Sequence, residues 1–426
     1  MKTLSRRQRF RALLLPLLLV LAGGPPAAGQ VLPAEPLVFG AGRVTLSGDV
    51  SATYGCAHVP EQAGVTASWC GDDTGFFNYT DYDRSTLRML RIDLNTAVRA
   101  TSQLSILSDI RTENGAGIRA YGLYVRFHPW EKRGIDIQAG RIPPTFGAFP
   151  RRSYATDNLL IGYPLAYQYL TSLRADALPR TADDLLRMRG RGWLASYPIG
   201  DVNPANGMPV VSAFTWDTGV QVHAASTKIE ATAALTTGSL GRPLFVDDNA
   251  GKQIAVRVAA RPVAGLIIGA SGARSPYIAR SALDETPAAD RMGSFTQSAF
   301  GADVEYSRAY YLLRFETIVS DWTLPIVGSP DIHLPLRATS TLIEGRYKLR
   351  PGLYVAARAD RLGFSDVTGT GGHTETWEAP ISRLEAGLGY SIRRNVQLKG
   401  SVQHDDRDGG RVHRATIVAG QLLYWF

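Results

Sequence analysis

Short runs in which apolar and polar residues alternate recur from Arg43 onward, and they restrict the fold more than any other feature. In the run 383–388, for example, three apolar residues alternate with Arg383, Glu385 and Gly387. Successive side chains of a strand point to opposite faces, so each run predicts a strand with one apolar and one polar face. A soluble β-sandwich also alternates, but here the polar faces hold charges in mid-strand and the apolar faces suit lipid. The pattern therefore favours a closed transmembrane barrel, because an open sheet edge would leave backbone groups unpaired in hydrocarbon.

The runs predict sixteen strands. They are expected at residues 43–54, 86–99, 102–112, 117–128, 134–142, 211–224, 228–237, 252–261, 264–273, 297–307, 309–319, 336–349, 352–362, 381–392, 395–404 and 412–426. Short turns alternate with longer connections that are rich in Gly, Asp, Asn and Pro. Outer-membrane barrels have short turns at one end, long loops at the other and an even number of strands. We therefore predict an all-β fold, a transmembrane antiparallel up-and-down β-barrel of about 16 strands over residues 43–426.

The first 29 residues have the order of a secretory signal peptide. Basic residues up to Arg11 precede a short apolar run, Leu13 to Leu21, and small residues around Ala28 and Gly29 would allow cleavage. The apolar run is shorter than the roughly 20 residues that span a bilayer, which disfavours a membrane anchor. This segment carries five positive charges and no acidic residue, so its removal lowers the formal net charge from +8 to +3. Nucleic acid is therefore not expected as a partner. Residues 30–42 are expected to be a lead-in to the barrel.

Two cysteines, Cys56 and Cys70, are the only ones in the chain. Export places them in an oxidising compartment, where a disulfide is the usual outcome. A pair of free thiols or a metal site is the alternative, but only His58 lies nearby as a further metal ligand. We expect no metal and no cofactor.

Aromatic residues cluster at the strand ends beside the short turns. They are Phe127, Trp130, Tyr306, Tyr310, Tyr311, Tyr347, Tyr354, Tyr390, Tyr424 and Phe426. Amphipathic rings are typical of the interface between hydrocarbon and water. The cluster predicts an interfacial girdle at this end of the barrel.

Two motifs resemble outer-membrane porins. The final residues, with Tyr424 two positions before Phe426, resemble the C-terminal strand signature that the barrel-assembly machinery reads in outer-membrane barrels. The stretch Gly140 to Gly147 resembles the Gly-Arg…Pro-Phe-Gly sequence that leads many sixteen-stranded porins into their third loop. The resemblance implies that the connection 143–210 folds into the lumen as a constriction or a plug, and it also implies a homotrimer. Leu159-Leu160, the segment 183–188 and the Pro-rich pieces of this connection predict short helices.

Charged residues are the candidates for the lining of the pore, because rings of charge at a constriction set ion preference. From the early strands the inward candidates are Arg91, Arg111 and Arg126. From the long connection they are Arg151, Arg152, Asp157, Asp176, Asp183 and Asp184. An arginine wall facing acidic loop residues would create a transverse field. The many arginines of the connection favour anions, but inward acids such as Asp93 and Glu344 make this preference weak.

The leading hypothesis is a porin in the cell outer membrane that allows passive diffusion of small hydrophilic solutes or ions. Its expected partners are outer-membrane lipid and the assembly machinery. A barrel that serves as a scaffold or sheath for a periplasmic partner, such as an electron carrier, would use the same strands. A barrel-type hydrolase is less favoured, because no nucleophile elbow, phosphate-binding loop or metal-spaced histidine pair is present. The chain is not expected to be an enzyme.

Overall fold

The computed structural model describes residues 33–62, 65–71, 79–80, 87, 89–114, 117–130, 133–213, 215–249, 251–287, 294–325, 332 and 334–426. The chain divides into two compact units, residues 1–34 and residues 35–426, and the second contains the barrel. The expected signal peptide, residues 1–29, lies outside the described residues. In the described part of the chain, no helix has the length and apolar character needed to cross a bilayer.

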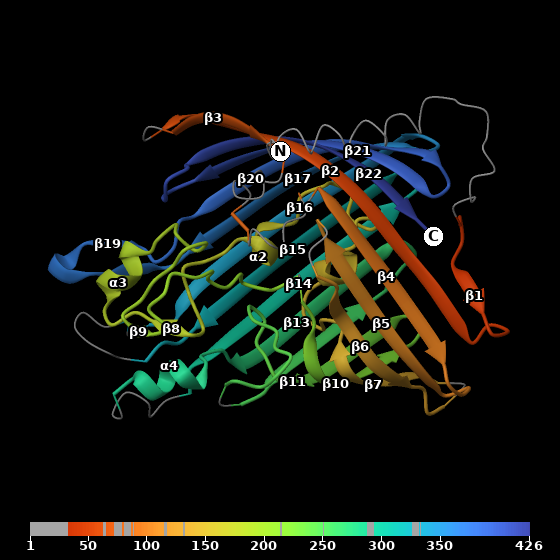
Figure 1. The fold of residues 1–426 in the computed structure, drawn as a ribbon, viewed down its shortest axis with the longest axis horizontal. Coiled ribbons are helices and arrows are strands. Elements are labelled where there is room, and N and C mark those ends of the chain that lie inside the picture. Colours follow the sequence, from red (N-terminus) through yellow and green to blue (C-terminus); the bar gives the residue numbers. More distant parts are fainter. Residues whose placement is uncertain are drawn as a thin grey trace, which may run out of the picture. The chain divides into compact units, whose positions relative to one another are not determined.

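Sixteen antiparallel strands close into a barrel (Figure 1). They are β2 (Val44–Gln62), β4 (Leu90–Arg99), β5 (Leu104–Glu113), β6 (Arg119–Phe127), β7 (Gly134–Ile142), β10 (Asp217–Ala225), β11 (Ile229–Thr236), β12 (Gln253–Ala260), β13 (Leu266–Pro276), β14 (Thr296–Arg308), β15 (Tyr311–Trp322), β16 (Leu336–Arg350), β17 (Leu353–Phe364), β20 (Ile381–Arg393), β21 (Val396–Arg407) and β22 (Arg414–Trp425). Each strand pairs with the next one in the order given, and β22 pairs with β2 from Asp49↔Trp425 to His58↔Thr416. This last pairing leaves no open edge, which confirms the predicted barrel and its strand number.

The barrel strands agree with the expected ranges to within about four residues except at β2 and β10. The first strand was expected to end at residue 54 but continues to Gln62, because it pairs with β3 beyond the barrel wall. Strand β10 was expected to begin at residue 211 but begins at Asp217. Val210 and Val211 are buried in an apolar core, and the amide of Ser212 donates to Leu240 O outside the barrel ladder. The long connection therefore runs from residue 143 to residue 216, because packing inside the barrel overrides the strand pattern of its last residues.

The faces of the strands are inverted relative to a soluble protein. On β20, Leu384 is 61% exposed on the outer face, whereas the neighbouring Arg383 on the inner face is fully buried. On β17, Val355 is exposed and Arg358 is buried. Apolar side chains thus cover the outside and charged side chains line the inside, as expected of a barrel in lipid.

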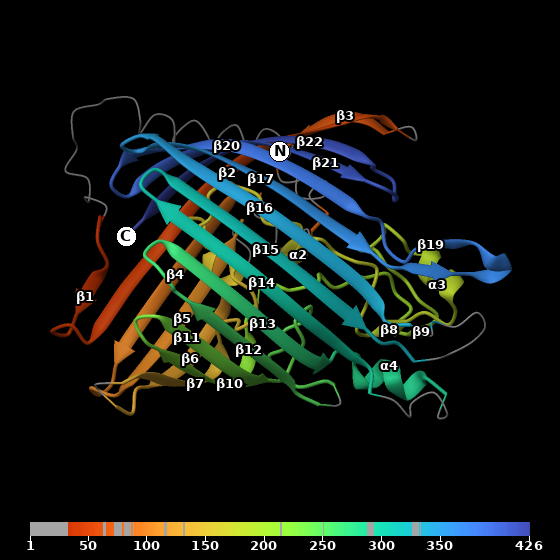
Figure 2. The same ribbon diagram turned by 180° about the vertical axis from the view of Figure 1, so that it is seen from behind.

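The two ends of the barrel differ in their connections. At one end, which we call the turn end, short turns join the strands and the C-terminus lies there (Figure 1). At the other, the loop end, the connections are long and form further elements (Figures 1 and 2). These are β3 (Val65–Cys70), η3 (Phe149–Arg152), α2 (Leu165–Gln168), β8 (Ala177–Leu178), α3 (Ala182–Arg187), β9 (Ile199–Gly200), α4 (Arg280–Glu285), β18 (Asp366–Thr368), η5 (Thr370–Gly372) and β19 (Thr374–Thr376). The long connection contains η3, α2, β8, α3 and β9, and of these η3 and α2 lie between the walls of strands. At the turn end, β1 (Leu37–Phe39) pairs with β2 within the expected lead-in.

Helix α3 falls where the segment 183–188 predicted a helix, and Thr181 caps it by accepting from the Asp184 amide. The helix expected at Leu159-Leu160 is absent, since these residues form bends. Both leucines are instead buried against the inner wall, where they pack with Tyr354. Tyr354 is therefore an inward residue that donates to Leu159 O (2.9 Å) and does not belong to the girdle in which it was expected.

Most of the other girdle aromatics lie on the outside beside the short turns. Those exposed are Phe127, Trp130, Tyr310, Tyr311, Tyr347 and Tyr390. Tyr311 and Tyr347 lie side by side, with ring centroids 4.9 Å apart.

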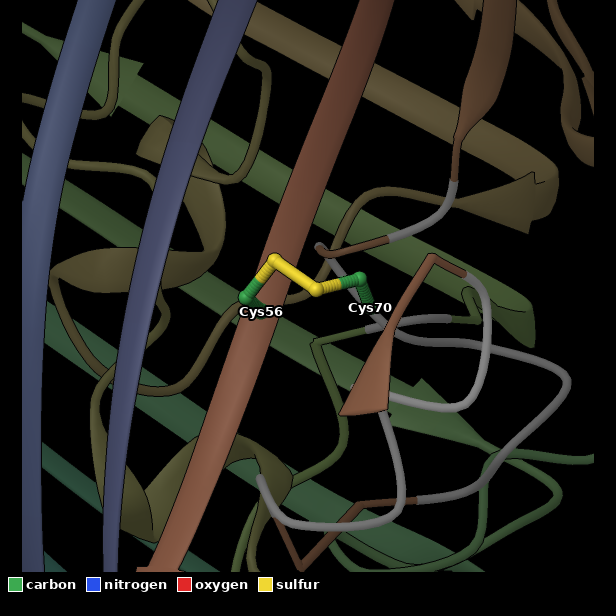
Figure 3. The surroundings of a disulfide bond; sticks show 2 residues. All are labelled: Cys56 and Cys70. Atoms are coloured by element: carbon green, nitrogen blue, oxygen red, sulfur yellow. A yellow bond between two sulfur atoms is a disulfide. The ribbon is translucent and has the colours of Figure 1, made fainter. Parts of the chain in front are cut away.

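Cys56 and Cys70 form a disulfide that joins β2 to the end of β3 at the loop end (Figure 3). The two residues face each other in the β2–β3 ladder.

Candidate functional site

The interior of the barrel is the candidate site, because the charged faces of the strands and the long connection 143–216 meet there. In Figures 1 and 2 this connection, with α2, lies between the front and back walls of strands. Gly147 lets it turn inward: its φ is +79°, and a Cβ there would lie 2.3 Å from the Tyr167 hydroxyl. The Gly147 amide donates to Ser271 Oγ on β13 (3.1 Å), and the Ala148 amide donates to Glu316 on β15 (2.7 Å). The Phe-Gly motif therefore places backbone donors directly on the inner wall.

Arg152 and Tyr154 are two residues apart and reach opposite parts of the inner wall. Arg152 pairs with Glu305 on β14 (Nη2–Oε2 2.7 Å), and the Tyr154 hydroxyl donates to Asp109 on β5. Going round the barrel from β5 to β14, six strands lie between them on one side and eight on the other. This short segment, 152–154, bridges the interior close to a diameter.

The next part of the connection lies on β17, β20 and β21. Arg358 donates to Gly162 O (2.7 Å) and to Asn158 Oδ1 (2.9 Å). The Gly162 amide donates in turn to Glu385 Oε1 (2.9 Å). Lys399 donates to two backbone carbonyls of the connection, one of them that of Asn158 (2.6 Å). These contacts fix the chain against the wall, since buried charged donors and acceptors need such partners.

A row of alternating charges runs round the wall at this level, and we call it the charge row. It consists of Arg152, Glu305, Arg314, Glu344, Arg358 and Glu385. Its links are short, with Arg314 2.9 Å from Glu305 and 3.0 Å from Glu344. Each acid of the charge row has one or two arginine neighbours, so the positive and negative charges of the row largely cancel.

Two of the arginines that were expected to form a cationic wall are paired with an acid in the structure. Arg91 and Arg111 do face inward and are buried, but both bind the same carboxylate, that of Asp93. Arg91 also donates to the Tyr163 hydroxyl (3.0 Å), and Arg111 stacks on the Tyr121 ring at 4.1 Å. The two guanidinium groups are thus neutralised and anchored by their neighbours and do not form a bare cationic surface.

Asp157 is exposed within the interior segment and lies near charges of the wall. Burial of the carboxyl group raises its pKa, whereas Arg314, Lys399 and Arg152 lower it. Asp157 therefore faces basic residues as the sequence suggested, although they belong to β15, β21 and the connection instead of β4 and β5.

Arg126 lines a separate polar pocket of about 330 Å³ on β6, β7, β10 and β11. The pocket also includes Gln138, Gln221 and His223. It lies on the inner wall toward the turn end, next to the residues where the connection begins.

Three acidic candidates lie at the loop end. Asp183 accepts hydrogen bonds from Thr370, and Asp184 caps α3 and pairs with Arg187 (3.1 Å). Asp176 pairs with Arg174 (2.9 Å) beside β8. Their partners belong to the connection or to η5, so the structure does not bring them to Arg91 and Arg111. The side chain of Arg151 lies outside the described part of the structure.

Glu378, between β19 and β20, anchors the connection at the loop end. It is fully buried and accepts from the amides of Ser172 (2.6 Å) and Gly190 (2.6 Å) and from the Tyr169 hydroxyl (3.2 Å). Burial raises the pKa of Glu378 above its usual value, whereas these backbone donors and Arg407 lower it. Sequence analysis missed this residue, since it belongs to no strand and no motif.

Around this anchor the barrel interior is filled by an apolar core. Trp322, Leu362 and Ile381 from the loop ends of the strands, with Trp377 between β19 and β20, pack with residues of the connection such as Tyr169. The rings of Trp322 and Trp377 meet edge to face, with centroids 5.9 Å apart. Among the described residues no cluster of His, Cys, Asp and Glu could hold a metal ion.

Neither known family models nor curated protein sequences match this chain. Solved structures do match. An anion-selective porin from Comamonas acidovorans superposes with a TM-score of 0.54 at 11% identity, over 90% of this chain and 99% of that one. The outer-membrane channel DcaP of Acinetobacter baumannii gives 0.51 at 8% identity, over 95% and 100% of the two chains. A loop-deletion mutant of OmpT, an outer membrane protein of Vibrio cholerae, gives 0.50 at 10% identity, over 90% and 100%. The chain thus has the barrel fold of Gram-negative outer-membrane porins.

Proposed function

We propose that this protein is an outer-membrane porin that lets small hydrophilic solutes diffuse through the barrel. The observation that carries this proposal is the inverted barrel, with apolar side chains outside and charged side chains inside. A charged inner wall matches an interior that holds water and polar solutes, and an apolar outer wall matches surrounding lipid. The proposal includes export with cleavage of residues 1–29 and assembly into the outer membrane.

We further propose that the connection 143–216 forms the narrowest part of the path. Arg152 and Tyr154 support this, since they bridge the interior between β14 and β5. A solute passing at this level would meet Asp157 and the partly exposed members of the charge row, Arg152, Glu305 and Arg314.

The proposed ion preference is at most weakly anionic. Arg91 and Arg111 share Asp93, and the arginines of the charge row alternate with glutamates. Paired charges attract neither sign strongly, and the exposed carboxylate of Asp157 opposes an anion preference, so the preference stays weak.

Single-channel recording in a planar bilayer tests these proposals. The refolded mature protein should give steady ohmic steps, and the reversal potential in a salt gradient should lie close to zero. The double variant Arg152→Ala/Tyr154→Ala should show clearly larger steps, because it removes both ends of the bridge. Arg187→Ala is the matched control, since this arginine is exposed on α3 and its ion-pair partner among the described residues is Asp184. Equal steps in the double variant and the wild type would contradict the constriction.

A second function, a barrel scaffold that conducts nothing, is favoured by one observation, the apolar core at the loop end. Silence from correctly folded wild type would support it, and the partner would then bind at the barrel surface because the connection already occupies the interior. The homotrimer stays a prediction, which the mass of the refolded protein in detergent tests.

A further inference from the structure

Each of the seven short turns at the turn end carries an arginine or a lysine. Six of these residues are exposed: Arg99, Arg133, Lys228, Arg308, Arg350 and Arg393. We call them the turn ring. The seventh turn holds Arg261, which pairs with Glu230 (2.9 Å). Because the turns follow one another round the barrel, the positive charges encircle this end instead of forming a patch on one side.

The turn ring has few acidic neighbours. In the described parts of the seven turns no side chain is acidic, and the sequence places one acid there, Glu131, which lies outside the described residues. No ion pair joins a residue of the turn ring to an acid among the described residues, although Arg394, which follows Arg393 in the same turn, pairs with Glu35 (2.9 Å). Some exposed loop-end arginines do have an acidic partner, since Arg337 pairs with Asp321 (2.7 Å) and Arg414 with Asp406 (3.5 Å).

Exposed aromatic rings lie next to the turn ring on the outer wall. Trp130 precedes Arg133, whose guanidinium lies 5.6 Å from its ring centroid, and Tyr310 follows Arg308. Aromatic residues on a membrane protein mark the depth of the lipid headgroups. The turn ring is therefore at the level of the phosphates, all round the barrel.

We propose that the turn ring binds the phosphate groups of anionic phospholipids in the leaflet at the turn end. Basic residues close to an anionic leaflet are attracted to it over about one Debye length. A protein partner would need charges on one face, whereas a shell of lipid meets the whole circumference. This inference rests on the membrane location in the proposed function, and it does not require that the barrel conducts.

Native mass spectrometry of the refolded protein in detergent, titrated with phosphatidylglycerol or phosphatidylcholine, tests the proposal. The wild type should retain phosphatidylglycerol in preference to phosphatidylcholine, and high salt should abolish the preference. In Arg308→Gln/Arg350→Gln/Arg393→Gln the affinity for phosphatidylglycerol should fall by about tenfold or more. The matched control removes three exposed loop-end arginines, Arg180→Gln/Arg191→Gln/Arg411→Gln, and should bind as the wild type does.

An equal loss in both variants, or no loss in the turn variant, would overturn the proposal. So would a wild type that retains both lipids equally at low salt, even if a variant did not fold. Binding to isolated peptidoglycan without a preference for phosphatidylglycerol would assign the turn ring to the cell wall and also overturn it. A silent channel with intact lipid preference would refute the porin alone, because the mass measurement does not depend on conductance.

Discussion

The two ends of this barrel differ in their interiors, since the loop end holds an apolar core and the turn end holds a polar pocket. At the loop end, Trp322 and Trp377 turn into an apolar core that the connection 143–216 completes. At the turn end, the inner wall holds a polar pocket with Arg126 and His223, and the aromatic rings face outward instead. The interior is thus apolar where the connection packs against the wall and polar where the wall lines an open pocket.

The difference shows where the stability of the fold resides. The apolar core inside the loop end is large, whereas the apolar cluster nearer the turn end is small and consists of Leu159, Leu160, Leu312, Tyr354 and Ala356. Substitutions inside the loop end should therefore cost more than similar substitutions at the turn end.

The largest effect is expected for Trp377→Ala. Its ring is fully buried between Phe364 and Trp322, so its loss should lower the free energy of unfolding by about 3–5 kcal/mol. The control Trp130→Ala, at the exposed turn end, should cost about 1 kcal/mol or less. Urea titration of both variants in lipid vesicles measures the two values. Similar costs for the two tryptophans would remove the distinction between the ends.

The disulfide at the loop end should have the next effect. Cys56 and Cys70 are 14 positions apart. A disulfide that closes a loop of this size lowers the conformational entropy of the unfolded chain, which stabilises the fold by about 3 kcal/mol. Cys56→Ser/Cys70→Ser should lower the unfolding midpoint in denaturant, and reducing agent should have the same effect on the wild type only. If the double variant unfolds at the wild-type midpoint, the β2–β3 extension contributes nothing to the stability of the barrel.

The smallest effect concerns pH and Glu378. Its folded pKa is raised by burial, so the folded state holds the proton more tightly than the unfolded state does. The stability of the wild type relative to Glu378→Gln should therefore fall as the pH rises above the unfolded pKa of about 4.3, by at most about 1.4 kcal/mol per pH unit. Denaturant titrations from about pH 4 to about pH 7 measure this slope. A stability difference for Glu378→Gln that does not change with pH would show that the group titrates alike in both states.

The strands were predictable because their pattern is local. The expected range 134–142 matches β7, Gly134–Ile142, since alternation and the flanking turns lie within the same few residues. The inward side chains were predictable for the same reason, as with Arg91 and Arg111 on the polar faces of β4 and β5. The start of β10 was not, because Val211 alternates as a strand residue does but packs in the apolar core.

The partners of the site residues could not be predicted. Arg91 and Arg111 share one carboxylate because adjacent strands bring Asp93 opposite Arg111, which depends on a register that the sequence does not specify. Glu378 meets Gly190 across 188 positions, and no local pattern links them. The acids at 176, 183 and 184 were placed in the lumen because they lie in the long connection, but its path carries them to the loop end.

The seam between β2 and β22 has a consequence for how the chain must assemble. It joins residues that are hundreds of positions apart, as in the hydrogen bond from Gln421 to Thr53, across 368 positions. Until β22 reaches β2, both outer strands have bare edges that can recruit a second chain. We therefore expect the pairing of β22 with β2 to be the last and slowest step of folding, because the two strands lie at opposite ends of the sequence. A cell that makes this protein has to keep the nearly finished sheet apart from its copies during that interval.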